Sequence, residues 1–116
     1  MLKKYQMYWV DLTPQNNKKN EMTGKERPCV IFENDLILNA NGNTVCYAIP
    51  ITTKVTGNTI LGVQLSKLVT GLPQDSEIVL TQMRVISKDR LRDFIISLPK
   101  EKQNELDKKM KFMLDI

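Results

Sequence analysis

The sequence predicts a mainly β fold: a small β-barrel with short helical segments and one α-helix near its C-terminus. Short stretches rich in β-branched, aromatic and alternating apolar residues are separated by polar turn sequences. Only the last segment shows helical periodicity. A chain of 116 residues supplies one hydrophobic core, so we expect a single domain over residues 1–116.

Each expected strand has its own reason. Residues 7–10 are aromatic and β-branched, which favours a strand. The second strand starts at Arg27-Pro28 and covers residues 29–32, because a proline at the first strand position needs no ladder donor. Residues 61–65 alternate in the manner of a strand. The remaining expected strands are residues 44–52, with Pro50 marking an edge, bend or bulge, residues 77–85 and residues 93–98.

Three helical segments are expected. Residues 34–38 predict a short helical turn, and residues 87–91 a short turn or 3₁₀ segment. The last segment is a helix with Pro99 in its first turn and Ser97 as its N-cap. Its apolar face has helical spacing and consists of Leu106, Met110, Met113 and Leu114. We expect this face to pack on the core.

A polar stretch over residues 13–25 separates the first two strands. A connection of this length without an apolar period is unusual in a compact domain, and such loops are generally functional or mobile. Six basic and three acidic residues fall within residues 1–30, against a net charge of +4 for the whole chain. This local excess fits an anionic partner such as nucleic acid, and it equally fits a solvated surface.

Several chemistries are excluded by residues that the sequence lacks. There is no histidine, and two cysteines cannot form a zinc site by themselves. Both cysteines lie in apolar stretches, which predicts free buried thiols. No glycine-rich phosphate loop is present. We therefore expect chemistry without a metal or cofactor. No membrane-spanning run and no signal peptide are evident, so we expect a cytoplasmic protein without a membrane partner.

Separated blocks of the sequence resemble one family along essentially the whole chain. The blocks are YWVDL at residues 8–12, Pro14, Gly24, Arg27-Pro28, IPITTK at residues 49–54, GLP at residues 71–73 and QMR at residues 82–84. In this order they resemble the MazF/PemK toxins of bacterial type II toxin–antitoxin systems. The resemblance implies an SH3-like barrel and a homodimer. It also implies a metal-independent endoribonuclease that cuts single-stranded RNA at short sequences, and a cognate antitoxin that blocks the RNA site.

RNA cleavage needs few protein groups, because the 2′-OH of the RNA is itself the nucleophile. The enzyme must neutralise charge on the phosphate and assist proton transfer. The planar guanidinium of Arg27 suits the phosphate, although a surface salt bridge is an equal interpretation from the residues alone. Thr52 alone is most simply a strand residue. The resemblance instead places it at the family's catalytic threonine, so Arg27 and Thr52 are the expected catalytic pair.

The remaining site residues follow from the same resemblance. With a one-residue insertion in the loop, Glu21 falls on an acidic position and is the candidate base, whereas Glu26 is a candidate ion-pair partner for Arg27. Many relatives have an acidic residue where this chain has Thr81. The expected RNA-binding residues are Lys25, Thr53, Lys54, Gln82 and Arg84. The expected antitoxin is an acidic, partly disordered chain, because the same basic groove would attract it.

Two other functions remain open from the sequence. The same barrel is compatible with a toxin that acts by binding a protein target, as the gyrase-poisoning toxins do. It is also compatible with a degenerate homologue that binds RNA or an antitoxin without cutting. The residues Arg27 and Thr52 favour the ribonuclease.

Overall fold

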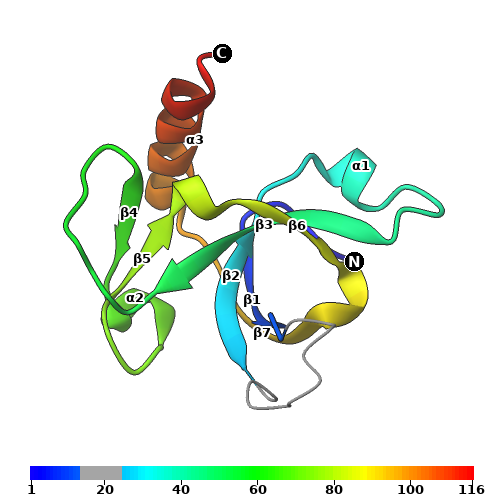
Figure 1. The fold of residues 1–116 in the computed structure, drawn as a ribbon, viewed down its shortest axis with the longest axis horizontal. Coiled ribbons are helices and arrows are strands. Elements are labelled where there is room, and N and C mark those ends of the chain that lie inside the picture. The colour runs from blue at the N-terminus through cyan, green and yellow to red at the C-terminus, as the bar shows by residue number, and fades with distance from the viewer. Residues whose placement is uncertain (14–24) are drawn as a thin grey trace.

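The computed structural model describes residues 1–13 and 25–116 (Figure 1). The expected 13–25 loop falls almost entirely outside these residues, and Glu21 lies outside them. In chain order the elements are β1 (Gln6–Asp11), β2 (Glu26–Ile31), α1 (Asp35–Leu38), β3 (Val45–Thr52), β4 (Gly62–Leu65), α2 (Lys67–Thr70), β5 (Ser76–Val79), η1 (Leu80–Gln82), β6 (Arg84–Ser87), η2 (Lys88–Arg90), β7 (Leu91–Ser97) and α3 (Lys100–Leu114).

Within the described residues, seven strands form one antiparallel sheet with the order β4-β5-β3-β2-β1-β7, and β6 pairs with β3. The sheet curls strongly, so that β1, β2, β3, β6 and β7 surround one interior (Figure 1). Its hydrogen-bonded path is not closed into a full barrel, since β4 and β7 stand at opposite ends. The expected mainly β fold with a helix near the C-terminus is confirmed.

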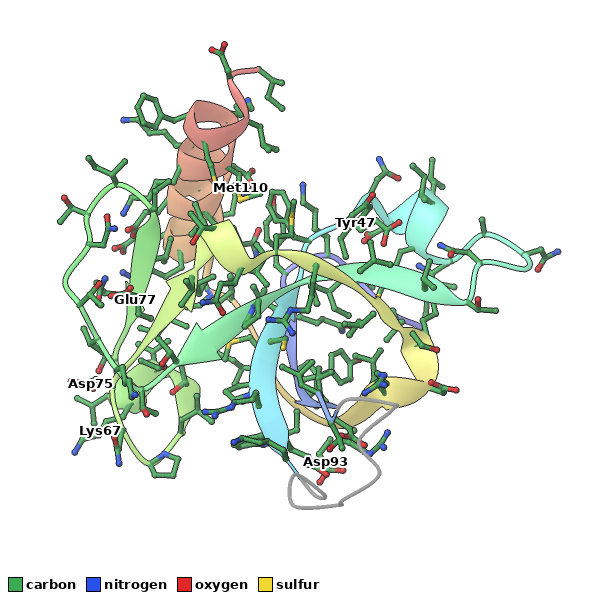
Figure 2. All side chains as sticks on the ribbon, viewed as in Figure 1. Tyr47, Lys67, Asp75, Glu77, Asp93 and Met110 are labelled. Atoms are coloured by element: carbon green, nitrogen blue, oxygen red, sulfur yellow. The ribbon has the colours of Figure 1, made fainter. Side chains whose placement is uncertain are left out.

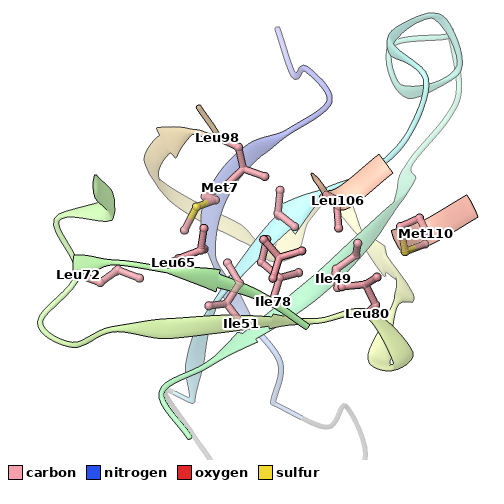
Figure 3. Packing of buried hydrophobic residues seen from close by; sticks show 12 residues of the cluster. Met7, Ile49, Ile51, Leu65, Leu72, Ile78, Leu80, Leu98, Leu106 and Met110 are labelled. Carbon is pink, nitrogen blue, oxygen red and sulfur yellow. The ribbon is translucent and has the colours of Figure 1, made fainter. Parts of the chain in front are cut away.

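The core has two parts, one on each side of β3. One contains Cys46 and Ala48 and fills the curled interior. The other contains Ile49 and Ile51 and is covered by α3, which contributes Leu106 (Figure 3). Alternate β3 side chains face opposite ways, so this one strand contributes to both parts. The expected helix face is confirmed for Leu106, Met110 and Met113. It is wrong for Leu114, which is exposed near the helix end.

The predicted strand over residues 77–85 is wrong, because the chain there forms β5, η1 and β6 instead. Both strands pair with β3: Ile51 lies opposite Ile78, and Ala48 lies opposite Arg84. Ile51 and Ala48 are three positions apart on β3, whereas their partners Ile78 and Arg84 are six positions apart. The three surplus residues leave the ladder as η1. This insertion places Gln82 outside the sheet ladder.

One helix start and one additional helix differ from expectation. Ser97 is not the N-cap of α3, because it still pairs with Gln6 in the sheet; Pro99 precedes the helix without a side-chain cap. The short helix α2 was not predicted. Its start and end nevertheless have ordinary signals, since the Ser66 hydroxyl accepts the Leu68 N–H and Gly71 adopts the left-handed conformation with φ of 76°.

Candidate functional site

A polar groove of about 530 Å³ opens where β2, β3, β5, η1 and β6 meet. Five residues expected from the sequence to act in catalysis or RNA binding line it. These are Arg27, Thr52, Lys54, Gln82 and Arg84. The folding of the sheet thus brings together residues that are up to 57 positions apart in the chain.

The groove is the polar end of the curled sheet's inner face. Side chains two apart on a strand share a face, so one strand can be apolar in the interior and polar at the rim. The inner-face residues are Arg27, Cys29 and Ile31 on β2, Ala48 and Thr52 on β3, and Arg84 and Ile86 on β6. The interior members are buried, which fixes where the rim residues stand.

Arg27 lies near the start of β2, opposite Val10 of β1, and is exposed. Among the described residues it forms no ion pair within 4.0 Å, so neither a surface salt bridge nor the suggested pairing with Glu26 is present there. Its backbone is held in the sheet while its guanidinium lines the groove. This arrangement leaves a fixed positive charge available to an anion.

Thr52 ends β3 and is half-buried. Its hydroxyl oxygen accepts the backbone N–H of Lys54 at 3.1 Å. That bond uses one lone pair and leaves the hydroxyl proton able to donate to a ligand. The local turn therefore orients Thr52 and at the same time brings Lys54 to the groove.

Gln82 and Arg84 reach the groove from the η1 insertion and the first residue of β6. Thr81, at the position that is acidic in many relatives, also lines the groove and is exposed. A hydroxyl there cannot take up a proton at neutral pH as a carboxylate does, so this position supplies no general base. Gln82 carries both a donor and an acceptor, which suits a contact to a base edge.

Two expected RNA-binding residues are not among those lining this groove. Thr53 instead lines a smaller cavity of about 190 Å³, which Arg27 and Thr52 also border. Lys25 is exposed just before β2, where its carbonyl accepts the Leu12 N–H at 3.1 Å. Glu21, the candidate base, lies outside the described residues.

Glu77 is a groove residue that sequence reasoning missed. It lies in the β4–β5 part of the sheet (Figure 2), is only 3% exposed, and stands directly between Thr52 of β3 and Gln64 of β4. Burial raises the pKa of this carboxyl, but hydrogen bonds from Gln64, Thr56 and Gly57 hold the pKa below its ordinary value. A glutamate directly before the apolar residues Ile78 and Val79 of a strand was the one available signal.

The charges of the groove favour an anionic ligand. Arg27, Lys54 and Arg84 oppose the single buried carboxylate of Glu77 among its lining residues. In residues 1–13 and 25–116 there is no cluster of three or more acidic or cysteine side chains suited to hold a metal ion.

The two cysteines are free and buried, as expected. Burial raises the pKa of Cys29 to about 12 and that of Cys46 to about 11. A thiol with such a pKa is protonated at neutral pH and is therefore a poor nucleophile.

Comparison with known proteins identifies the family. A family model described as the PemK-like, MazF-like toxin of type II toxin–antitoxin systems matches residues 3–114. The chain belongs to this toxin family. Endoribonuclease MazF2 of Mycobacterium bovis and endoribonuclease MazF6 of Mycobacterium tuberculosis are each 26% identical over 121 residues, covering 100% of this chain and 99% of the relative.

Solved structures show the same fold. The Mycobacterium tuberculosis toxin MazF-mt6 superposes with a TM-score of 0.75 at 22% identity, covering 96% of this chain and 97% of that one. MazF in a MazE–MazF crystal structure from Deinococcus radiodurans gives 0.78 at 17% identity, covering 99% and 96%. A mycobacterial endoribonuclease in complex with its cognate antitoxin gives 0.71 at 17% identity, covering 97% and 92%. Within residues 1–13 and 25–116 of this toxin, no helix has the length and apolar character needed to cross a membrane.

Proposed function

We propose that this PemK/MazF-like toxin is a metal-independent, sequence-specific endoribonuclease that cleaves single-stranded RNA, mRNA in particular, in the cytoplasm. One observation carries the proposal: the groove gathers Arg27, Thr52, Lys54, Gln82 and Arg84 around one polar space. Family membership and the names of its endoribonuclease relatives support the same activity.

In the proposed reaction the RNA 2′-OH loses its proton and attacks the adjacent phosphorus, the bond to the 5′-oxygen breaks, and the departing oxygen takes up a proton from solvent. The products are a 2′,3′-cyclic phosphate end and a 5′-hydroxyl end. Arg27 neutralises charge that develops on the non-bridging phosphate oxygens, because its two-pronged guanidinium matches them. Thr52 donates its free hydroxyl proton as a hydrogen bond to the same phosphate, in the orientation set by Lys54 N–H.

The other groups serve RNA binding in this proposal. Lys54 and Arg84 contact phosphates, and Gln82 reads a base edge or holds the backbone. Thr53 and Lys25 contact the RNA where it leaves the groove. Thr53 does so at the smaller cavity, and Lys25 does so beside the start of β2. Glu21 remains the proposed base that removes the 2′-OH proton.

We further propose a homodimer and an antitoxin partner. Val45, Tyr47 and Val85 form an exposed apolar strip on β3 and β6, since Tyr47 lies opposite Val85 and each is between 42% and 51% exposed. Such a strip would be covered by a second subunit, which supports a twofold dimer. The groove's net positive charge supports a cognate antitoxin with an acidic, partly disordered segment that competes with RNA.

The test is incubation of the purified protein with a long single-stranded RNA in excess EDTA. We expect cleavage with 5′-hydroxyl ends. Arg27→Ala should slow cleavage by about 10²–10³-fold, as loss of one preorganised donor does elsewhere. Arg27→Lys should recover only part of the rate, because lysine lacks the planar fork.

The matched control is Arg92→Ala. Arg92 is ion-paired to Asp11 at 3.2 Å on the surface and does not line the groove, so cleavage should stay near the wild-type rate. Cleavage that requires Mg²⁺, or 5′-phosphate ends, would contradict the mechanism. RNA or antitoxin binding without any cleavage would favour a degenerate homologue. Inhibition of DNA gyrase without RNA cleavage would favour a toxin that binds a protein target.

A further inference from the structure

Glu77 places a buried negative charge among the residues that line the groove. This charge does not help the groove to bind a phosphate. Glu77 is 3% exposed, and none of the described lysines or arginines pairs with it within 4.0 Å. Burying a carboxylate is costly unless hydrogen bonds compensate, and its charge repels RNA phosphates. Its presence therefore needs a structural benefit, and the hydrogen bonds to Glu77 identify that benefit.

Nearly all of those hydrogen bonds come from one short segment after β3. The Glu77 carboxylate accepts the backbone N–H of Thr56 at 3.0 Å and of Gly57 at 3.2 Å. It also accepts the Thr56 hydroxyl at 3.0 Å and the Gln64 amide at 2.9 Å. Gly57 has a positive φ of 73°, so the segment turns sharply at this point. The Glu77 carboxylate thus accepts the two backbone N–H groups that have no strand partner in this turn.

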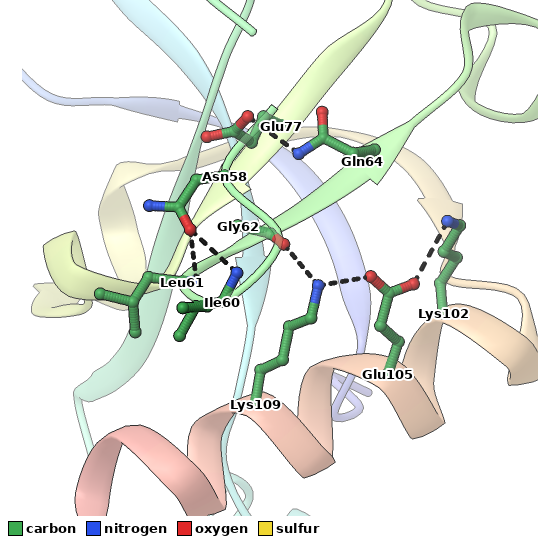
Figure 4. A network of polar contacts seen from close by, with 9 residues as sticks. All are labelled: Asn58, Ile60, Leu61, Gly62, Gln64, Glu77, Lys102, Glu105 and Lys109. Carbon is green, nitrogen blue, oxygen red and sulfur yellow. Dashed lines mark hydrogen bonds and ion pairs between the residues drawn. The ribbon is translucent and has the colours of Figure 1, made fainter. Parts of the chain in front are cut away.

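The segment held in this way lines the groove with hydrogen-bond donors. Lys54 and Asn58 stand on either side of the two amides that Glu77 binds, and both line the groove. Asn58 is fixed by its oxygen, which accepts the N–H groups of Ile60 and Leu61, each at 2.9 Å (Figure 4). With its oxygen engaged, Asn58 can present only its NH₂ group to a ligand.

The strand behind this turn is itself anchored. Lys109 of α3 donates to the Gly62 carbonyl at 2.8 Å and to Glu105 at 2.8 Å (Figure 4). Gln64, which donates to Glu77, lies on the same strand β4. The turn is therefore held against a rigid support, and it does not depend on RNA to acquire its shape.

We propose that Glu77 is a positioning residue for RNA recognition. Its carboxylate shapes residues 54–58 into a wall that presents Lys54 to a phosphate and the Asn58 NH₂ to an acceptor atom of a neighbouring nucleotide. This inference rests on the proposed ribonuclease function for its substrate. Because the chemistry takes place at Arg27 and Thr52, loss of Glu77 acts on RNA binding more than on the cleavage step.

The experiment compares Glu77→Ala with Glu77→Gln. In Glu77→Ala the wall loses its anchor, so KM for a single-stranded RNA in EDTA should rise about tenfold while kcat stays within about threefold. Glutamine keeps one carbonyl oxygen for the Thr56, Gly57 and Gln64 donors, and its NH₂ can donate to the Thr56 hydroxyl. Glu77→Gln should therefore recover most of the lost affinity.

Amide hydrogen exchange provides a readout that does not depend on cleavage. The amides of Thr56 and Gly57 should exchange faster in Glu77→Ala than in wild type, and near the wild-type rate in Glu77→Gln. Asn58→Asp keeps the oxygen cap on Ile60 and Leu61 but removes the NH₂ donors. It should weaken binding of a fluorescently labelled mixed-sequence single-stranded RNA without changing exchange at Thr56.

Asp107→Ala is the matched control, because Asp107 is also a hydrogen-bonded, partly buried carboxylate but lies outside the groove, where it accepts the Tyr5 hydroxyl at 2.6 Å. Its KM should remain at the wild-type value. An unchanged KM in Glu77→Ala, or an equal rise in Asp107→Ala, would overturn the positioning role. A wild-type protein that cleaves no RNA would instead refute the proposed function, and the exchange and RNA-binding measurements would still decide whether Glu77 shapes the wall.

Discussion

Gly62 should resist substitution because of the carboxylate behind it. A Cβ atom at this position would lie 2.9 Å from both Cδ and Oε2 of Glu77 and 2.9 Å from the Asn58 carbonyl oxygen. Non-bonded carbon contacts are optimal at about 3.5–4.0 Å, so the neighbours must move by roughly 0.5 Å or more. Those neighbours are Glu77, which holds residues 54–58 in place, and Asn58, which belongs to that segment. Gly62→Ala therefore disturbs stability and RNA binding together.

The stability cost has two opposing terms. Overpacking a tight site costs about 1–3 kcal/mol. Replacing glycine in a strand returns about 0.5–1 kcal/mol, because the unfolded chain loses freedom. The net loss should be at most about 2.5 kcal/mol, which for a chain of this size lowers Tm by at most about 10 °C. Urea denaturation and a thermal scan of Gly62→Ala measure both quantities.

A double-mutant cycle identifies the cause. In a Glu77→Ala background the clashing atoms are gone and the Asn58 turn is free to move, so Gly62→Ala should cost at least 0.5 kcal/mol less (an approximate threshold for coupled neighbours). Gly42→Ala is the contrasting variant. Its φ of 80° is unfavourable for alanine, but no atom lies within 4 Å of the added Cβ, so its stability cost should be equal in the wild-type and Glu77→Ala backgrounds. Additive costs for Gly62 and Glu77 would refute the reasoning.

Three further outcomes are expected. Leu106→Ala, at a fully buried position on the core-facing side of α3, should lower the free energy of unfolding in urea by about 2–5 kcal/mol. Phe112→Ala, 72% exposed on the same helix, should change it by less than about 0.5 kcal/mol. Cys29, with its pKa raised to about 12 by burial, should react with iodoacetamide at pH 8 far more slowly in the folded protein than in urea, and equal rates would show an accessible thiol. The folded-state pKa of Glu77 lies below its ordinary value, so the ionised carboxylate stabilises the folded protein fully at pH values above the ordinary glutamate pKa. This stabilisation is lost as the pH falls through the folded-state pKa. The free energy of unfolding, measured as a function of acid pH, should therefore change less for Glu77→Gln than for wild type.

The fold was predictable where local patterns and burial agree. The apolar stretch over residues 44–52 predicts a strand, and the structure has one over Val45–Thr52. The split of residues 77–85 was not predictable, because no glycine, proline, asparagine or aspartate interrupts the segment to indicate a turn. What divides the segment is the pairing of β3 with two partners in different registers, which is a long-range property.

The site residues likewise divide into those that the sequence predicted and those that it did not. The family resemblance named Arg27, Thr52, Lys54, Gln82 and Arg84, and folding places all five in one groove. Thr53 lies just beyond the end of β3, and the structure places it at the smaller cavity and not at the groove. Glu77 could not be assigned a role from sequence, because its donors lie 13 to 21 positions away in the chain.

The length of the η1 insertion constrains how this toxin can be altered. On β5 the groove side carries the odd-numbered Glu77, whereas on β6 it carries the even-numbered Arg84. An odd surplus of three residues is what reverses this parity between two strands laid against the same neighbour. Removing or adding a single residue at positions 80–82 would turn Arg84 toward solvent and Val85 toward the apolar interior beside Cys46. The basic side of the groove therefore depends on the number of residues in η1 as well as on their identity, and loop engineering there must proceed two residues at a time.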